Sequence, residues 1–159
     1  MQERRKRARS DAKAEGTRRD EPGLSLRMQR ERRVISAQHR QLDDFALRFA
    51  AALDAGEPPA AQAAFLRFSD ALEAHLALED GLYFPALRGL RPALEPDLEA
   101  LRDEHQTLRE SLVGLARLVE AGRCAACVKP LEQLAGELAE HEGREEGLLA
   151  SLRTGGNAP

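Results

Sequence analysis

Apolar residues recur at steps of three and four along four stretches of the chain, and clusters of glycine and proline separate these stretches. Such spacing places apolar side chains on one face of a helix, so the pattern predicts four amphipathic helices. Four helices with short connections favour an all-α fold, an up-down-up-down four-helix bundle. The apolar stripes are Ile35, Leu42, Ala46, Phe49 and Leu53; Phe65, Phe68, Leu72 and Leu82; Leu101, Leu108, Leu112, Leu115 and Val119; and Leu131, Leu134, Leu138 and Leu148.

Glycine and proline mark the ends of the predicted helices. Gly56 and Gly122 follow the first and third stripes, where a glycine in the left-handed conformation commonly closes a helix. Proline suits the first position of a helix, so the fourth helix is expected to begin near Pro130. Gly81 and Pro85 are expected to kink or weaken the last turns of the second helix.

Charge is unevenly distributed along the chain. The first 30 residues carry ten Lys and Arg against five Asp and Glu, whereas all 159 residues together have a net charge of −3. Such a start suits a solvated tail or a tether to nucleic acid, and the tail is the favoured interpretation. We therefore expect a basic, disordered or partly helical extension over 1–29, the bundle over 30–153 and a flexible tail over 154–159. Met28, just before the bundle, is compatible with a later start of translation.

Two further features concern location and redox chemistry. No apolar run approaches the roughly 18 residues needed to cross a bilayer, and no hydrophobic export signal follows the basic start, so a cytoplasmic protein is predicted.

Cys124 and Cys127 form an isolated CxxC motif, without the further cysteines of a zinc or iron–sulfur site. They are interpreted either as a redox dithiol or as two small residues in a loop or a first helical turn.

All four histidines and two glutamates fall on a pattern that repeats at an interval of 66 residues. The same interval relates Ala55-Gly56 to Ala121-Gly122, which predicts two helical hairpins with approximate two-fold symmetry. We refer to the repeated polar set as the six donor residues. They are His39, His75 and Glu79 in the first copy, and His105, His141 and Glu145 in the second.

The six donor residues are expected to lie together for two reasons, namely the helix face on which each lies and its distance along the bundle from the hairpin tips. Positions four apart lie about 40° from each other on a helix, so each HxxxE pair shares the apolar face. Counted from the glycine turns, all four histidines lie about 25 Å from the hairpin tips at 1.5 Å per residue. One copy alone would suit a hydrogen-bonded core histidine or an exposed ion pair, but two matched copies predict two bound cations. Mixed nitrogen and oxygen donors suit iron, manganese or zinc, and open coordination positions favour iron.

These motifs resemble the hemerythrin HHE cation-binding domain, a family of non-haem di-iron four-helix bundles, over roughly residues 30–153. The resemblance implies two iron ions as the cofactor, expected as an oxo-bridged pair, with other divalent metals as alternatives. It also implies four terminal histidine ligands, bridging by Glu79 and Glu145, and, by symmetry, His39 and His75 on one iron with His105 and His141 on the other. The resemblance is carried by His39, His75-Leu-Ala-Leu-Glu79, Leu82-Tyr83-Phe84-Pro85, His105 and His141-Glu-Gly-Arg-Glu145.

One position departs from the oxygen-carrying hemerythrins, which have a fifth histidine four residues from the one on the third helix. Here the flanking positions are Leu101 and Arg109, so simple reversible oxygen carriage is not expected. Tyr83 is a candidate to hydrogen-bond a bridging carboxylate or a bound oxygen species, the alternative being a core-edge ring with its hydroxyl in solvent. Asp43 and Glu146 are weaker candidates for outer carboxylates or substitute ligands, and exposure to solvent is the favoured interpretation of both.

The first functional hypothesis is a di-iron protein that binds O2, NO or peroxide as a sensor or scavenger, or that acts in iron handling. The alternatives are a di-iron enzyme that consumes peroxide or NO or repairs iron clusters, and a bundle that uses metal for stability or interaction. No membrane partner and no nucleic-acid partner is expected.

Overall fold

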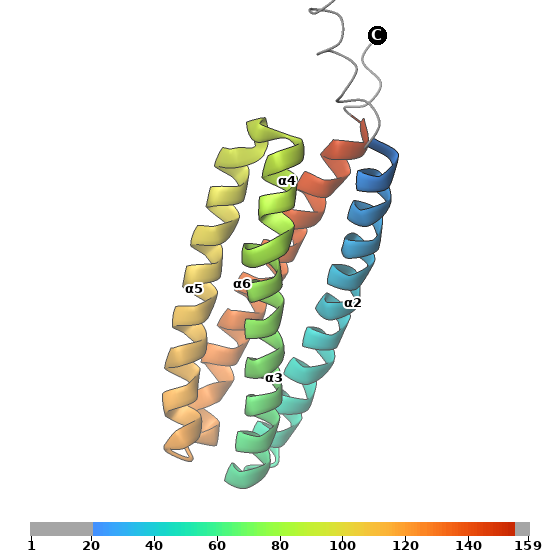
Figure 1. The fold of residues 1–159 in the computed structure, drawn as a ribbon. Helices are drawn as coiled ribbons and strands as arrows, with labels where there is room; N and C mark the ends of the chain where they lie inside the picture. The colour runs from blue at the N-terminus through green and yellow to red at the C-terminus, as the bar shows by residue number, and fades with distance from the viewer. Residues whose placement is uncertain (1–20, 155–159) are drawn as a thin grey trace, which may run out of the picture. The chain divides into compact units, whose positions relative to one another are not determined.

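A computed structural model describes residues 21–154 of the chain (Figure 1). Residues 1–20 and 155–159, with most of the predicted basic extension and tail, lie outside the described residues. The chain divides into two units, residues 1–36 and 37–159, and the described part of the first unit is the beginning of α2. The described elements, which include no strand, are α2 (Glu21–Asp54), α3 (Pro58–Leu78), the π-helical turn η2 (Glu79–Tyr83), α4 (Phe84–Leu90), the 3-10 turn η3 (Pro92–Leu94), α5 (Glu95–Glu120) and α6 (Cys124–Thr154).

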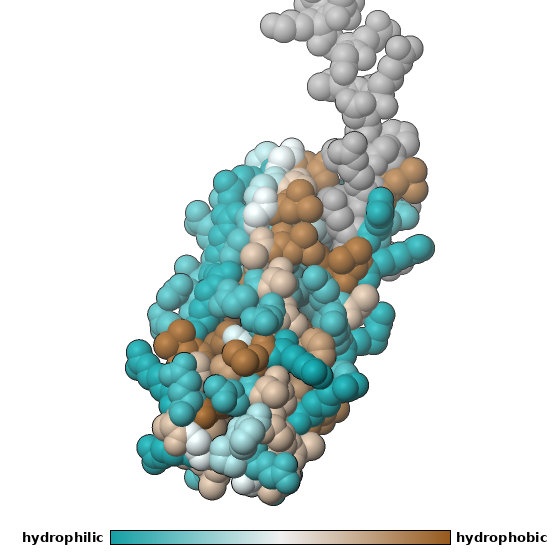
Figure 2. Space-filling view, turned by 60° about the horizontal axis from the view of Figure 1, so that its bottom comes forward, coloured by the Kyte–Doolittle hydropathy of each residue, from teal (hydrophilic) through white to brown (hydrophobic). Residues whose placement is uncertain are grey.

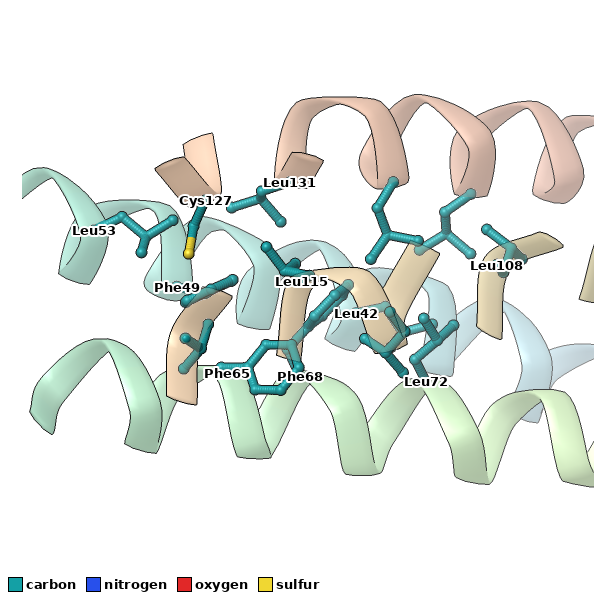
Figure 3. Close-up of a cluster of buried hydrophobic side chains, with 14 of the residues drawn as sticks. Leu42, Phe49, Leu53, Phe65, Phe68, Leu72, Leu108, Leu115, Cys127 and Leu131 are labelled. Carbon is teal, nitrogen blue, oxygen red and sulfur yellow. The ribbon is translucent and has the colours of Figure 1, made fainter. Parts of the chain in front are cut away.

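Four long helices build the second unit, namely α3, α5, α6 and the part of α2 from Ala37 onward, and they lie side by side in Figure 1. Their inner faces bury leucine and phenylalanine side chains, with the Phe49 and Phe65 rings 5.5 Å apart (Figure 3). Full burial of one such side chain contributes about 1.5–3 kcal/mol. Thirteen of the predicted stripe residues belong to this core, namely Leu42, Phe49, Leu53, Phe65, Phe68, Leu72, Leu108, Leu112, Leu115, Val119, Leu131, Leu134 and Leu138.

Glycine turns end two of the helices where the sequence predicts. α2 and α5 each end two residues before a glycine. Gly56 and Gly122 have φ angles of 67° and 66°, a left-handed conformation in which a side chain would be strained. Pro58 then occupies the first position of α3, where its missing N–H costs no helical hydrogen bond.

The predicted weakening of the second helix takes the form of a π-helical turn. The Phe84 N–H donates to the carbonyl of Glu79, five residues back instead of four, and Pro85 follows at the start of α4. The wider turn rotates the residues that follow, so Tyr83 and Phe84 are buried while Leu82 is 52 % exposed. The prediction that Leu82 belongs to the core was wrong, because it assumed an uninterrupted period of 3.6 residues.

The fourth long helix begins earlier than predicted. α6 starts at Cys124 and carries Pro130 inside it, so Cys124 lies in a first helical turn, as one interpretation expected. Cys127 is fully buried and lies beside Leu131 and Phe49 in the core (Figure 3). This burial favours the helical conformation before the proline, and it offsets the hydrogen bond that the proline ring removes. Both cysteines are free thiols.

The outer surface of the second unit exposes few large apolar side chains. The face shown in Figure 2 is mostly hydrophilic, with separate apolar patches. At the end of α6 the core residue is Leu149, four positions after Glu145, whereas the predicted Leu148 is only half-buried. Within residues 21–154, no helix combines the length and the apolar character that crossing a membrane requires. The exposed large apolar residues of this unit are Leu47, Leu66, Leu82, Leu90 and Val113.

Candidate metal centre

The six donor residues lie together in the interior of the second unit. His39 is 6 % exposed and the other five are 0 % exposed. They come from every long helix and from the π turn: His39 on α2, His75 on α3, Glu79 at the start of η2, His105 on α5, and His141 and Glu145 on α6. The structure therefore brings together all six residues that the sequence singled out.

Glu79 lies at the centre of the cluster. Its oxygens are 3.4 Å from His75 Nε2, 3.1 Å from His105 Nε2 and 3.5 Å from His141 Nε2. The His105 and His141 Nε2 atoms are 3.2 Å apart. The fourth histidine, His39, places its Nε2 3.3 Å from Oε2 of Glu145. Every histidine thus turns its Nε2 atom inward, toward a carboxylate.

The other ring nitrogen of each histidine faces outward, toward an oxygen of a polar side chain. A partner within hydrogen-bond distance accepts the Nδ1 proton, which fixes the tautomer and leaves Nε2 with a lone pair. We call these partners the four outer acceptors. They are Asp80 at 2.9 Å from His105, Glu104 at 3.0 Å from His141, Gln38 at 3.4 Å from His75 and Glu142 at 3.9 Å from His39.

Sequence reasoning did not single out the outer acceptors, although the repeat contains a signal for two of them. Gln38 and Glu104 are 66 residues apart, and each accepts from the histidine of the following long helix. The counterpart of Asp80 in the second copy is Glu146, which is exposed, as predicted. The residue that faces His39 is instead Glu142. The two-fold repeat breaks here because the π turn around Asp80 has no counterpart in the continuous helix α6.

The inward-facing Nε2 atoms and carboxylate oxygens require cations or protons between them. A lone pair on Nε2 and a carboxylate oxygen are both acceptors, so they repel unless a proton or a cation lies between them. The Nε2 atoms of His39 and His75, and both oxygens of Glu79 and of Glu145, are buried without a hydrogen-bond partner among the described residues. Donors that share one cation at about 2.1 Å lie about 3.0–3.4 Å apart. The separations of 3.1–3.5 Å match that spacing, so these residues fit a metal site.

The donors form two groups that share one residue. His39, His75 and Glu79 make one group, and Glu79, His105 and His141 make the other, with the ligand atoms of each group within 4.8 Å of one another. Glu145 belongs to neither group but contacts His39. Each group offers two nitrogens and one oxygen, which is the donor set that iron, manganese and zinc accept.

The cluster shifts the pKa values of its members in opposite directions. Burial lowers the pKa of His75 to about 4, although Glu79 acts against it. Burial also acts to lower the pKa of His39 and of His141, but the neighbouring carboxylates outweigh it and raise both above 6.5. Burial acts to raise the pKa of Glu79, yet the neighbouring histidines lower it to about 2, whereas burial raises the pKa of Glu145. Without metal, His39 and His141 therefore keep the second proton, which separates the facing acceptors, to a higher pH than an ordinary histidine does.

Metal affinity is expected to fall as the pH falls, starting above pH 6.5. Each group contains one histidine with a raised pKa, His39 or His141, and a metal must displace its second proton. The affinity of each group should therefore drop about tenfold per pH unit below that raised pKa. Metal-buffered titrations at a series of pH values between 5 and 8 measure the slope. An affinity that does not change over this range would contradict the prediction.

Tyr83 is more deeply placed than one of its interpretations allowed. Its side chain is 1 % exposed and its hydroxyl is buried, so the interpretation with the hydroxyl in solvent was wrong. The ring lies 6.4 Å from that of Phe84, which in turn stacks on His105 with centroids 5.3 Å apart. Asp43 is exposed, as expected.

The fold and the site define a class, that of all-helical proteins with a buried histidine and carboxylate centre for cations. The family model of the hemerythrin HHE cation binding domain matches residues 31–152. The chain therefore belongs to the hemerythrin HHE cation-binding domain family, which confirms the resemblance seen in the sequence. Comparison with curated proteins and with solved structures gave no match.

Proposed function

We propose that the chain is a hemerythrin-like, non-haem di-iron protein of the cytoplasm that binds O2, NO or peroxide as a sensor or scavenger, or in iron handling. The proposal includes an up-down-up-down order of the helices over residues 30–153. In the proposed centre, His39 and His75 hold one iron, His105 and His141 hold the other, Glu79 and Glu145 bridge them, and Tyr83 is a polar neighbour.

One observation supports this proposal above the others, namely the inward-facing Nε2 atoms of four histidines, three of which already have an acceptor for the outward N–H group. A histidine that served only the fold would satisfy its second nitrogen with a donor. Here the second nitrogens face carboxylates that have no donor of their own among the described residues. Leaving buried charges without partners costs about 3–5 kcal/mol each, so cations are the expected partners.

Ligand number and burial favour iron and a small ligand. Six protein donors for two ions leave several coordination positions open, and nitrogen and oxygen donors with open positions are typical of non-haem iron. Bound iron would supply redox chemistry and sites for O2, NO or peroxide. Because the six donor residues are only 0–6 % exposed, small ligands are favoured over large substrates. The Phe84 ring on His105 and the neighbouring leucine core exclude bulk water.

Anaerobic reconstitution with ferrous iron tests the proposed function. We expect two irons per chain, near-ultraviolet absorption of a ferric pair after exposure to air, and a new visible band when NO is added to the ferrous protein. Manganese and zinc, offered at equal concentration, show whether the site prefers iron.

A matched pair of variants controls this experiment. His75→Ala removes a buried donor and should lower iron content and NO binding, whereas Gln106→Ala changes an exposed residue beside His105 and should leave both unchanged. An iron content below one per chain in the wild type, or NO binding that His75→Ala does not alter, would refute the proposed function.

A further inference from the structure

The outer acceptors differ between the two groups of donors, and the difference is one of charge and of anchoring. We call the pair His105 and His141 the α5/α6 pair. Both of its histidines donate to carboxylates, Asp80 at 2.9 Å and Glu104 at 3.0 Å. Short bonds to a carboxylate raise the electron density on the ring and hold its orientation.

Arginines anchor these two carboxylates in turn. Arg109 donates to Asp80 at 3.1 Å and to Glu73 at 3.2 Å, so its guanidinium is fixed at both ends. Arg144 lies 2.9 Å from the second oxygen of Glu104. Arg102 lies 3.8 Å from Asp80, and its guanidinium is also 6.0 Å from the centre of the ring that stacks on His105. The α5/α6 pair is therefore held by a connected set of charged groups.

The pair His39 and His75, which we call the α2/α3 pair, has weaker outer partners. His75 faces the neutral amide oxygen of Gln38 at 3.4 Å, and His39 faces Glu142 at 3.9 Å, which is beyond hydrogen-bond distance. No arginine forms an ion pair with Glu142 in the part of the chain that the structure describes. Gln38 also lines a surface pocket of about 410 Å³ between α2 and α3.

We propose, on the basis of the proposed di-metal function, that the two metal positions are unequal: the α5/α6 pair binds its metal first and more tightly, and the α2/α3 pair binds a second, more readily released metal. Glu79 lies within reach of both pairs and so does not distinguish them. The difference comes from the outer acceptors, with Asp80 and Glu104 as positioning residues. Losing an outer partner of a metal-binding histidine typically lowers metal affinity about 10- to 100-fold.

The order of filling is tested by anaerobic titration of the metal-free, full-length protein with Co²⁺ alone, followed by calorimetry and by NMR of the histidine rings. The first equivalent should shift or broaden the rings of His105 and His141, and the second those of His39 and His75. The two affinities should differ about 10- to 100-fold. Simultaneous loss of all four ring signals, or filling of the α2/α3 pair first, would overturn the proposal.

Exchange of the two symmetry-related outer acceptors, Gln38 and Glu104, tests whether they cause the difference in metal affinity. Gln38→Glu gives His75 the carboxylate that Glu104 gives His141, and should raise the weaker affinity about tenfold or more, whereas Glu104→Gln should lower the tighter one by a similar factor. Gln41→Glu is the matched control, because it adds the same charge to an exposed residue of the same pocket. Equal effects of Gln38→Glu and Gln41→Glu would show that charge alone matters and would overturn the proposal.

The outcomes also separate this proposal from the proposed function. A protein that takes up no metal at these residues would refute both. Two equal affinities in the wild type would refute the inequality and leave the di-metal function standing. Because the order of filling is read from the wild type, the test remains decisive even if a variant does not fold.

Discussion

Glu79→Gln is expected to abolish binding of both metals at concentrations that saturate the wild type. The two Glu79 oxygens lie 3.1–3.5 Å from three histidine nitrogens, and Glu79 is the one residue common to both groups of donors. Glutamine keeps the size of the side chain but removes its charge and replaces one acceptor oxygen by an N–H donor. Both affinities should fall by at least about 100-fold, more than the loss of an outer partner causes.

Calorimetric metal titration and metal analysis after desalting measure this loss. Glu146→Gln is the matched control, because it makes the same change at an exposed residue of α6 next to Glu145. It should bind two metals as the wild type does. Wild-type stoichiometry and affinity in Glu79→Gln would contradict a shared role for this carboxylate.

The clustering of the six donor residues could be predicted from the sequence because its requirements are local and regular. A histidine and a glutamate four positions apart share one helix face whatever surrounds them, and the interval of 66 residues repeats that arrangement. Gly56 and Gly122 fix the heights, since a left-handed glycine ends a helix within one or two residues. Face and height together were enough to place six side chains in one cluster.

The outer acceptors could not be predicted in the same way, because they flank the donors and depend on small rotations of each helix. Asp80 reaches His105 within a π turn that changes the helical phase immediately after Glu79. The same change of phase turned Leu82 outward and Tyr83 inward. Gly81 and Pro85 signalled an irregularity, but its kind depends on which side chains the neighbouring helices can accommodate.

The repeat also suggested more symmetry than the structure has. The repeated spacing of His, His and Glu does not determine the outer partner of each histidine. Gln38 is that partner in the first copy, at the position where the second copy has Glu104. A search for metal ligands does not detect the difference between an amide and a carboxylate at this position, because neither residue is one of the six donor residues. It nevertheless decides how strongly each histidine is polarised.

Glu145→Gln is expected to stabilise the metal-free protein and to destabilise the metal-loaded one. Glu145 is 0 % exposed, and neither of its oxygens has a hydrogen-bond partner among the described residues. Burial raises the pKa of Glu145, so its ionised form is disfavoured in the folded protein, and a neutral glutamine of similar volume removes that cost. With metal present the sign should reverse, because the variant loses a ligand and with it part of the free energy of metal binding that stabilises the fold.

The pH dependence of the free energy of unfolding provides a second test of this prediction. Burial raises the pKa of Glu145 above its ordinary 4.5, so the folded protein binds its proton more tightly than the unfolded chain does. Its contribution to stability is therefore favourable at low pH and is lost as the pH rises through the folded-state pKa. In a chelator, the stability advantage of Glu145→Gln should thus be larger at pH 8 than at pH 5, measured as the free energy of unfolding in urea. Leu134→Ala, a core change, should instead cost about 2–5 kcal/mol with or without metal. If Glu145→Gln also lowers the stability of the metal-free protein at pH 8, the carboxylate is stabilised by groups other than a metal.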